Sequence, residues 1–216
     1  MRMWSVTTWL IVLNVAVYIL NQLTDGLLAE WGYFSAATVI GGLQLWRFIT
    51  FQFLHASVQH ILFNMISLYF FGPLIEGYLG PRKYLAFYLL CGVGGAVMYL
   101  ALWGIGVLPG GAQTPMVGAS AGIFGVLIAA ARVAPDARVM LLFPPIPMRM
   151  RTFALVMLGI ALWVVFTSGR NAGGQAAHLG GAAVGALLIW RPNVLNIFDR
   201  LRVRRTRGRF SPRDWR

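Results

Sequence analysis

A serine and a histidine in this chain stand within runs of small residues, Ser120 in GASAG and His178 in AAHLGGAAVG. A serine hydroxyl becomes a nucleophile when an adjacent imidazole accepts its proton, and such a pair can carry out acyl transfer. Two more polar residues, His60 and Asn64, stand four positions apart in HILFN, a spacing that places both on one face of a helix. These four residues are the chemical groups that the rest of the chain must position.

The chain around these residues is strongly apolar. It has 216 residues, of which 58% are hydrophobic and 11% charged, and its mean hydropathy is +0.70. A soluble domain carries about 25% charged residues, whereas long apolar runs are typical of transmembrane helices of about 20 residues. We predict an all-α polytopic membrane protein with six transmembrane helices, at residues 7–23, 58–79, 83–104, 117–134, 152–168 and 174–190. No signal-peptide cleavage site follows the first segment, so it is kept as a helix.

The net charge of +12 comes from basic residues between and after the apolar segments. The positive-inside rule assigns such residues to the cytoplasm. With the N-terminus in the cytoplasm, every lysine and arginine except Arg47 and Arg170 falls on that side. We therefore expect both termini in the cytoplasm, a six-helix domain over residues 1–192 and a basic cytoplasmic tail over 193–216. No base-stacking or base-reading pattern accompanies the charge, so a nucleic-acid partner is not expected.

The predicted topology brings the polar residues to one depth. The second, fourth and sixth helices all run from the outer face inward, and they begin near His60, Ser120 and His178. Polar groups inside a membrane are costly, so those that occur are candidate functional residues. Glu76, near the inner end of the second helix, lies too deep to join them and is expected to be structural. We predict that the serine, the two histidines and Asn64 converge just below the outer surface.

Glycines accompany both candidate groups: Gly118 and Gly122 flank the serine, and Gly181 and Gly185 follow the histidine on its helix face. Small residues at four-residue spacing let transmembrane helices approach closely, which a hydroxyl and an imidazole on separate helices need. Taken singly, a membrane serine usually bonds to a carbonyl of its own helix, and a lone histidine or asparagine often joins two helices. Their combination at one depth favours a nucleophile and its base.

The run from Gly118 to Gly122 also matches G-x-S-x-G, the nucleophile turn of soluble hydrolases. That turn needs a strand before the serine and an acidic residue between the serine and the histidine in the chain. The acid found there is Asp136, which the predicted topology places across the membrane. The soluble-hydrolase interpretation therefore fails.

The outer connection over residues 24–57 is long and is rich in aromatic and leucine side chains. Because tryptophan and tyrosine favour the headgroup region, we expect this segment to lie in the membrane interface. Connections of this length in compact folds are usually functional.

The order and spacing of these residues resemble those of the rhomboid family of intramembrane serine proteases. The likeness runs from the Trp46-Arg47 pair to about Gly185, through HASVQHILFN, Gly118-Ala119-Ser120 and the histidine motif H-x-x-G-x-x-x-G. Many members have glycine directly after the serine and tyrosine four residues after it. This chain has Ala121 and Phe124 at those positions, and neither change removes a catalytic group. We expect the Phe124 ring, one turn after the serine, to face His178.

The resemblance implies a serine endopeptidase that cleaves transmembrane segments of single-span proteins by a dyad of Ser120 and His178. It assigns the stabilisation of the oxyanion to Asn64, His60 and the backbone N–H of Ser120. We expect supporting roles for further residues: Gly118, Phe124, Gly181, Gly185 and His55. No metal or organic cofactor is required. The arginine-rich tail and the short chain suggest the inner membrane of a prokaryotic cell.

Two other classes of function were weighed. A rhomboid-like pseudoprotease would bind transmembrane clients without cleaving them, and the retention of Ser120, His178 and Asn64 argues against it. A small transporter or channel would need polar groups near the bilayer centre and repeated halves, and neither is found in the sequence.

Overall fold

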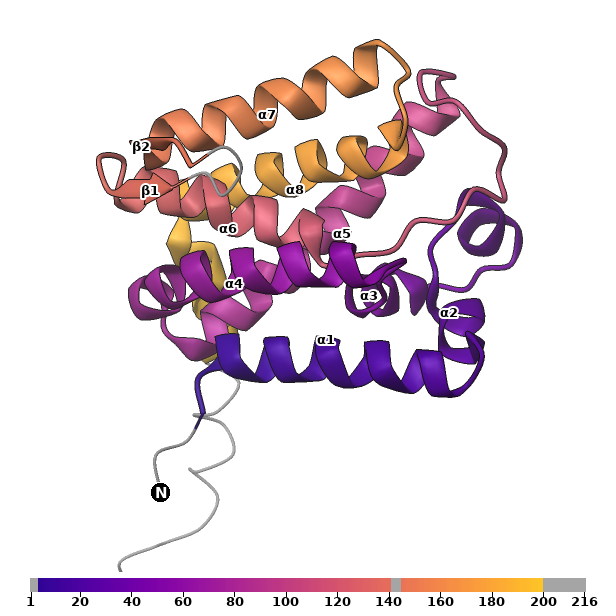
Figure 1. The fold of residues 1–216 in the computed structure, drawn as a ribbon, viewed down its shortest axis with the longest axis horizontal. Coiled ribbons are helices and arrows are strands. Elements are labelled where there is room, and N and C mark those ends of the chain that lie inside the picture. Colours follow the sequence, from indigo (N-terminus) through magenta and orange to yellow (C-terminus); the bar gives the residue numbers. More distant parts are fainter. Residues whose placement is uncertain (1–3, 141–144, 200–216) are drawn as a thin grey trace, which may run out of the picture.

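The structure is a computed structural model that describes residues 4–140 and 145–199 (Figure 1). Its six long helices are the predicted ones, each with ends within three residues of the expected range. They are α1 (Val6–Leu23), α4 (Val58–Leu79), α5 (Pro81–Gly104), α6 (Ser120–Val133), α7 (Met150–Phe166) and α8 (Ala172–Trp190). The all-α membrane bundle predicted from the sequence is therefore confirmed.

Shorter elements fill the connections. The outer connection contains α2 (Leu27–Gly32), a π-helix (Ala37–Gly41), α3 (Arg47–Thr50) and a 3₁₀ turn (Phe51–Phe53). Between α6 and α7 lies a small antiparallel pair, β1 (Arg138–Met140) and β2 (Pro147–Arg149), in which Arg138 pairs with Arg149. The sequence analysis did not predict this hairpin, because strands of three residues carry too little alternation to register as a pattern.

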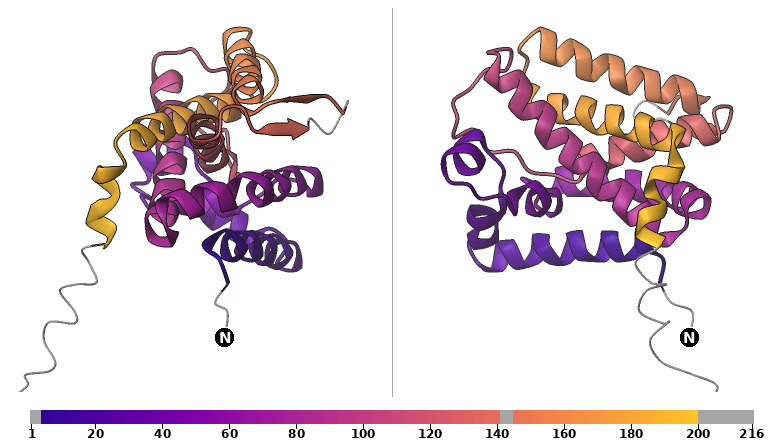
Figure 2. Two further views of the ribbon diagram at one scale, coloured as in Figure 1. Left: turned by 90° about the vertical axis from the view of Figure 1, so that its left-hand side faces the viewer. Right: turned by 180° about the vertical axis from the view of Figure 1, so that it is seen from behind.

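Helix α6 lies at the centre of the bundle and is short. It packs against α4, α5, α7 and α8, whereas α1 and α7 form opposite edges of the molecule (Figures 1 and 2). Within the described part of the chain, four helices (α1, α4, α5 and α8) have the length and apolarity needed to cross a membrane, while α6 has only 14 residues. A helix of that length spans about 21 Å, less than the roughly 30 Å hydrocarbon layer. In a bundle that crosses the bilayer, one end of α6 can therefore lie below the membrane surface.

Arg47 holds the outer connection together from within. Its side chain is buried, with 4% exposed, and its guanidinium lies 4.7 Å from the centre of the Tyr33 ring. It donates hydrogen bonds to the carbonyl oxygens of Tyr33 and Glu30 and to the side chain of Gln44. These acceptors satisfy a charge that would otherwise be costly to bury. Several aromatic and leucine side chains of the connection remain exposed, which suits the interfacial position expected from the sequence.

The outer connection also positions the segment that leads into α6. Phe34 and Met116 exchange backbone hydrogen bonds of 3.0 and 2.7 Å as an isolated antiparallel bridge. Two residues further on, the N–H of Gly118 donates to the carbonyl oxygen of Phe51. The residues just before Ser120 are thus fixed by the outer connection.

The segment after α8 begins with a 3₁₀ helix (Pro192–Asn196) whose Leu195 side chain is fully buried against the bundle. Lys83, at the start of α5, forms an ion pair of 3.0 Å with Asp199. The start of the predicted basic tail therefore packs on the bundle, and the rest of it, residues 200–216, lies outside the described residues. The division of the chain at residue 192 stays a prediction.

Glu76 joins α4 to the start of α1. Its carboxylate accepts hydrogen bonds from the N–H of Val6 at 2.7 Å, the N–H of Thr7 at 2.9 Å and the Thr7 hydroxyl at 2.7 Å. The first N–H groups of a helix lack partners within it, and a negative charge there also interacts favourably with the helix dipole. Glu76 thus has the structural role that its depth suggested.

We expect Glu76→Ala to lower the free energy of unfolding of the protein in detergent by about 2 kcal/mol, because two backbone donors and a hydroxyl lose a charged acceptor. The measurement is the shift in Tm followed by tryptophan fluorescence. Glu30→Ala is the matched control, because Glu30 takes part in the described hydrogen bonds through its backbone N–H and carbonyl oxygen and not through its carboxylate. Equal Tm values for the two variants would contradict the role of Glu76.

Candidate active site

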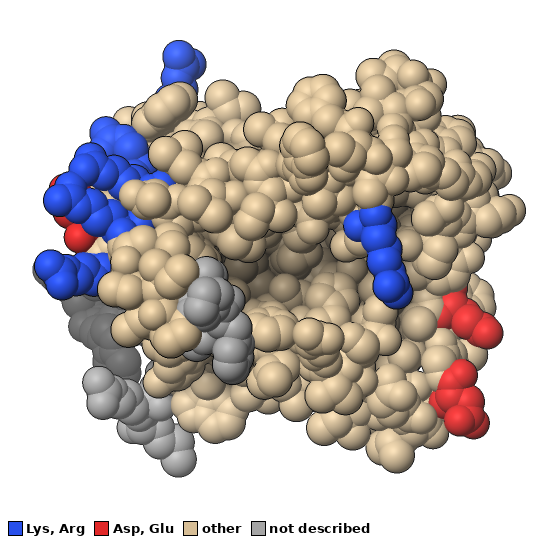
Figure 3. Space-filling view, turned by 45° about the horizontal axis from the view of Figure 1, so that its top comes forward, with Lys and Arg blue, Asp and Glu red and all other residues tan. Residues whose placement is uncertain are grey.

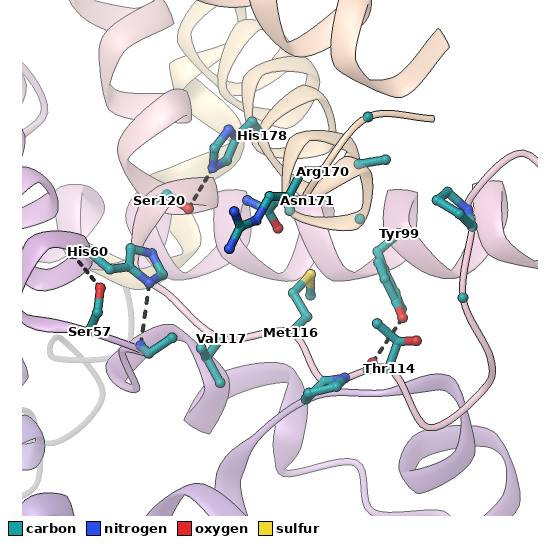
Figure 4. Close-up of a pocket in the computed structure, with 18 of the residues that line it drawn as sticks. Ser57, His60, Tyr99, Thr114, Met116, Val117, Ser120, Arg170, Asn171 and His178 are labelled. Atoms are coloured by element: carbon teal, nitrogen blue, oxygen red, sulfur yellow. Dashed lines mark hydrogen bonds between the residues drawn. The ribbon is translucent and has the colours of Figure 1, made fainter. Parts of the chain in front are cut away.

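A cavity of about 840 Å³ opens between the start of α4, the segment before α6 and the start of α8. It is lined by Ser120, His178, His60 and Asn64, together with residues of the α5–α6 and α7–α8 connections. Figure 4 shows Ser120, His178 and His60 in this lining. The surface of the molecule is hollowed near its centre, with a basic side chain beside the hollow (Figure 3). Arg170 is the basic residue that lines the cavity. The four polar residues singled out in the sequence are therefore brought to one place.

Ser120 and His178 form a hydrogen bond across two helices (Figure 4). The Oγ of Ser120, the first residue of α6, lies 2.7 Å from the Nε2 of His178, which lies in the second turn of α8. Residues 58 positions apart thus make a contact of the length typical for a hydroxyl and an imidazole. This arrangement can transfer a proton from the hydroxyl to the ring.

The imidazole of His178 is held on two further sides. The ring of Phe124, one turn after Ser120, stacks on it with the ring centres 4.1 Å apart and the planes within 12°. The Nδ1 of His178 lies 2.9 Å from the Oε1 of Gln175. Phe124 had been expected to face the histidine, but Gln175 was missed by the sequence analysis. The available signal was its position three residues before His178, a spacing at which helix side chains are neighbours.

Asn64 and His60, both in α4, line the same cavity as the serine. Ser57 caps the start of α4, and its Oγ accepts a hydrogen bond of 3.1 Å from the N–H of His60. The Asn64 side chain is buried, with 7% exposed, and its Nδ2 has no hydrogen-bond partner among the described residues. Because a buried amide without a partner is costly, this donor is a candidate for binding a group that enters the cavity.

Gly118 makes room for His60 beside the serine. A Cβ atom at this position would stand 2.7 Å from the Nε2 of His60 and 3.6 Å from the Oγ of Ser120. The backbone φ is +131°, which side chains other than glycine's strongly disfavour. The expected supporting role of Gly118 thus has a steric reason.

His55 lies behind the cavity rather than in its lining. Its side chain is buried and its ring packs edge-on against that of His60, with the ring centres 5.0 Å apart. Burial, with a smaller contribution from His60, lowers the pKa of His55 to about 3. The imidazole is therefore neutral at physiological pH and serves as a packing partner for His60.

The closest approach of α6 and α8 occurs at the predicted glycines of α8. A Cβ at Gly181 would fall on the backbone of Ala121, with the carbonyl carbon at 2.7 Å, and one at Gly185 would come 2.6 Å from the Cα of Gly125. Gly122 faces α5 instead, where a Cβ would stand 2.8 Å from the ring of Tyr88. The two α8 glycines therefore allow the backbone contact that brings His178 to the serine.

The methyl group of Ala121 points away from the reacting atoms. It is buried against Gly95 of α5, where an added Cβ would stand 2.5 Å from it. The alanine that follows the serine is thus accommodated by a glycine on the neighbouring helix. Residues 4–140 and 145–199 contain no group of three or more His, Cys, Asp or Glu side chains that could hold a metal ion.

We expect Gly181→Ala to lower any activity of the Ser120–His178 pair about 100-fold, because the added methyl separates α6 from α8 and small displacements of reacting groups are costly. The measurement is the rate of serine labelling by a fluorophosphonate. Gly159→Ala in α7 is the matched control, because a Cβ there meets nothing within 4 Å. Equal labelling rates in both variants would show that the close approach is not required.

Residues 42–192 match the rhomboid domain family. The chain is 29% identical to Rhomboid protease AarA of Providencia stuartii, over 85% of this chain and 71% of the relative. It is 28% identical to RHOMBOID-like protein 12, mitochondrial, of Arabidopsis thaliana, over 85% of this chain and 57% of the relative.

It is also 26% identical to Rhomboid protease GlpG of Yersinia pestis (strain Pestoides F), over 84% of this chain and 60% of the relative. The chain thus covers less than two thirds of the length of two of these three relatives. The family match itself extends over most of the bundle, from the outer connection to the end of α8. This chain is an integral membrane protein that belongs to the rhomboid family.

Proposed function

We propose that this protein is an intramembrane serine endopeptidase in which Ser120 is the nucleophile and His178 is the general base and acid. The observation that carries the proposal is the 2.7 Å contact between the Ser120 Oγ and the His178 Nε2 in the cavity. The names of two relatives, AarA and GlpG, describe those proteins as rhomboid proteases, which supports the same reaction class.

The proposed reaction passes through an acyl-enzyme. The Nε2 of His178 accepts the Ser120 proton as the Oγ attacks the scissile carbonyl carbon, and the resulting imidazolium protonates the leaving amine. A water molecule then gives a proton to His178 and attacks the ester carbonyl. Collapse of the second tetrahedral intermediate releases the carboxylic product and returns the proton from His178 to Ser120.

The negative oxygen that forms in each step needs hydrogen-bond donors. We assign this role to the Asn64 Nδ2, the His60 Nε2 and the backbone N–H of Ser120. The unpartnered amide of Asn64 supports the first assignment. The second gains support from a long hydrogen bond of 3.5 Å from the Ala56 N–H to the His60 Nδ1, because an accepting Nδ1 leaves the ring proton on Nε2. The third follows from the free N–H groups and the dipole at the start of α6.

The proposed substrates are transmembrane segments of single-span proteins. Their backbone must leave helical hydrogen bonding before a carbonyl can be attacked, so segments with helix-breaking or small residues are favoured. Hydrolysis also needs water, which the hydrocarbon layer lacks, and the cavity, whose lining includes several polar side chains, supplies a route for it.

We further propose that the cavity opens toward the non-cytoplasmic side and that both termini are cytoplasmic. Basic side chains gather at one end of the molecule, and Figure 3 shows most of them away from the hollow. This distribution fits the positive-inside rule. The proposed location is the inner membrane of a prokaryotic cell. Immunodetection or cysteine labelling of tagged termini in intact and permeabilised cells tests the orientation.

Ser120→Ala and His178→Ala are each expected to abolish nearly all cleavage of single-span substrates in liposomes, because the nucleophile or its base is removed. The wild-type serine should also react with a fluorophosphonate, which labels only an activated hydroxyl. Ser67→Ala is the control, because the Ser67 hydroxyl donates to a carbonyl of its own helix. Full cleavage by purified Ser120→Ala would refute the proposal, and client binding without cleavage or labelling by the wild type would favour a pseudoprotease.

Asn64→Ala is expected to lower kcat by about 10²–10³, the typical effect of losing one oxyanion donor. The substitution should leave the Tm near that of the wild type, because the amide nitrogen has no partner to lose within the described protein. The measurements are steady-state cleavage and thermal unfolding of the same preparation. An unchanged kcat would remove Asn64 from the oxyanion site.

A further inference from the structure

Gln175 contacts the catalytic histidine on the side opposite the serine. Its Oε1 lies 2.9 Å from the Nδ1 of His178, while the Nε2 of the same ring lies 2.7 Å from the Ser120 Oγ. We propose that Gln175 is a positioning residue, a neutral third member of the catalytic group that fixes the tautomer and orientation of His178. This inference depends on the proposed protease function.

The tautomer follows from the atoms that meet. A side-chain amide oxygen can only accept a hydrogen bond, so the Nδ1 of His178 must carry the proton in this contact. A neutral imidazole carries one ring proton, which leaves a lone pair on Nε2. The Ser120 hydroxyl therefore donates to Nε2. This is the tautomer in which His178 can accept the serine proton, and the opposite one would be inactive as a base.

The position of Gln175 relative to His178 is set by the helix itself. Both residues lie in α8, three positions apart, and Ala176 and Ala177 between them are buried against neighbouring helices. The Phe124 ring covers one face of the imidazole. With contacts at Nδ1, at Nε2 and on one face, the ring has one orientation that satisfies all three.

A neutral acceptor suits this location better than a carboxylate. The acids that the structure describes lie elsewhere: Asp25 and Glu30 stand in the outer connection, Glu76 bonds to the start of α1, Asp136 pairs with Arg149, and Asp199 pairs with Lys83. A carboxylate beside His178 would lose hydration within the bundle, which destabilises the folded protein unless the charge is paired. An amide oxygen orients the ring without that cost, and it gives less stabilisation to the imidazolium than a charge would.

Gln175→Met and Gln175→Glu separate the acceptor from the shape of the side chain. Methionine has a similar length but lacks a strong acceptor, so we expect kcat and the fluorophosphonate labelling rate to fall about tenfold, the worth of one typical hydrogen bond. KM should stay unchanged, because Gln175 lies outside the lining of the cavity. Glutamate keeps an acceptor oxygen and should retain kcat within about threefold, while the desolvation of its carboxylate should lower the Tm. Gln113→Met, in an exposed part of the segment before α6, is the matched control and should behave as the wild type.

The ring nitrogens of His178 give a direct readout that a merely structural role of Gln175 would not move. In protein labelled with ¹⁵N-histidine, the resonances of His178 are identified by their loss in His178→Ala. We expect the Nδ1-protonated tautomer in the wild type and in Gln175→Glu. In Gln175→Met a substantial fraction should change to the Nε2-protonated tautomer.

The possible outcomes distinguish a failure of the proposed protease function from a failure of the proposed role of Gln175. A wild type that neither cleaves nor labels would overturn the protease function. An active wild type with an unchanged kcat and tautomer in Gln175→Met would overturn the role of Gln175 alone. If Gln175→Met fails to fold, Gln175→Glu still decides: retained kcat with Nδ1 protonated supports the inference, whereas a loss of either contradicts it.

Discussion

The backbone contact between α6 and α8 is the constraint on which the site depends. Gly181 and Gly185 have no Cβ atoms, so α8 lies directly against Ala121 and Gly125 of α6. Nothing larger than glycine fits there without moving a helix. The hydrogen bond between the Ser120 hydroxyl and the His178 ring depends on that approach, because the two side chains start from backbones that are in contact.

A second constraint fixes the start of α6 along its own axis. The outer connection is held by a buried arginine, Arg47, whose hydrogen bonds are satisfied by backbone carbonyls and a glutamine. The Phe34–Met116 bridge transfers that rigidity to the residues before Ser120. Since α6 is shorter than the hydrocarbon layer, Ser120, the proposed nucleophile, can begin its helix inside the bundle while remaining open to the cavity.

The low dielectric of a membrane bundle accounts for the chemical character of the site. Each group around the His178 ring is neutral: a hydroxyl, an amide oxygen and the ring of Phe124. Soluble serine hydrolases use a carboxylate as the third group, but an unpaired charge here would be expensive to bury. In the proposed mechanism, orientation by Phe124 and Gln175 takes the place of electrostatic stabilisation by a charge, so the reaction depends on the precision of helix packing.

The sequence by itself determined the six helices, the equal depth of Ser120, His178, His60 and Asn64, and the need for glycines in α8. Long apolar runs and their charged ends report helix position and direction, which fixes depth. Tertiary structure alone decided how each helix is rotated about its axis and which neighbour it meets. The partner of Gly122, the direction of the Ala121 methyl and the contact of Gln175 with His178 depend on such rotations. Helices that are apolar on all sides have no distinct apolar face, so their hydropathy pattern does not reveal these rotations.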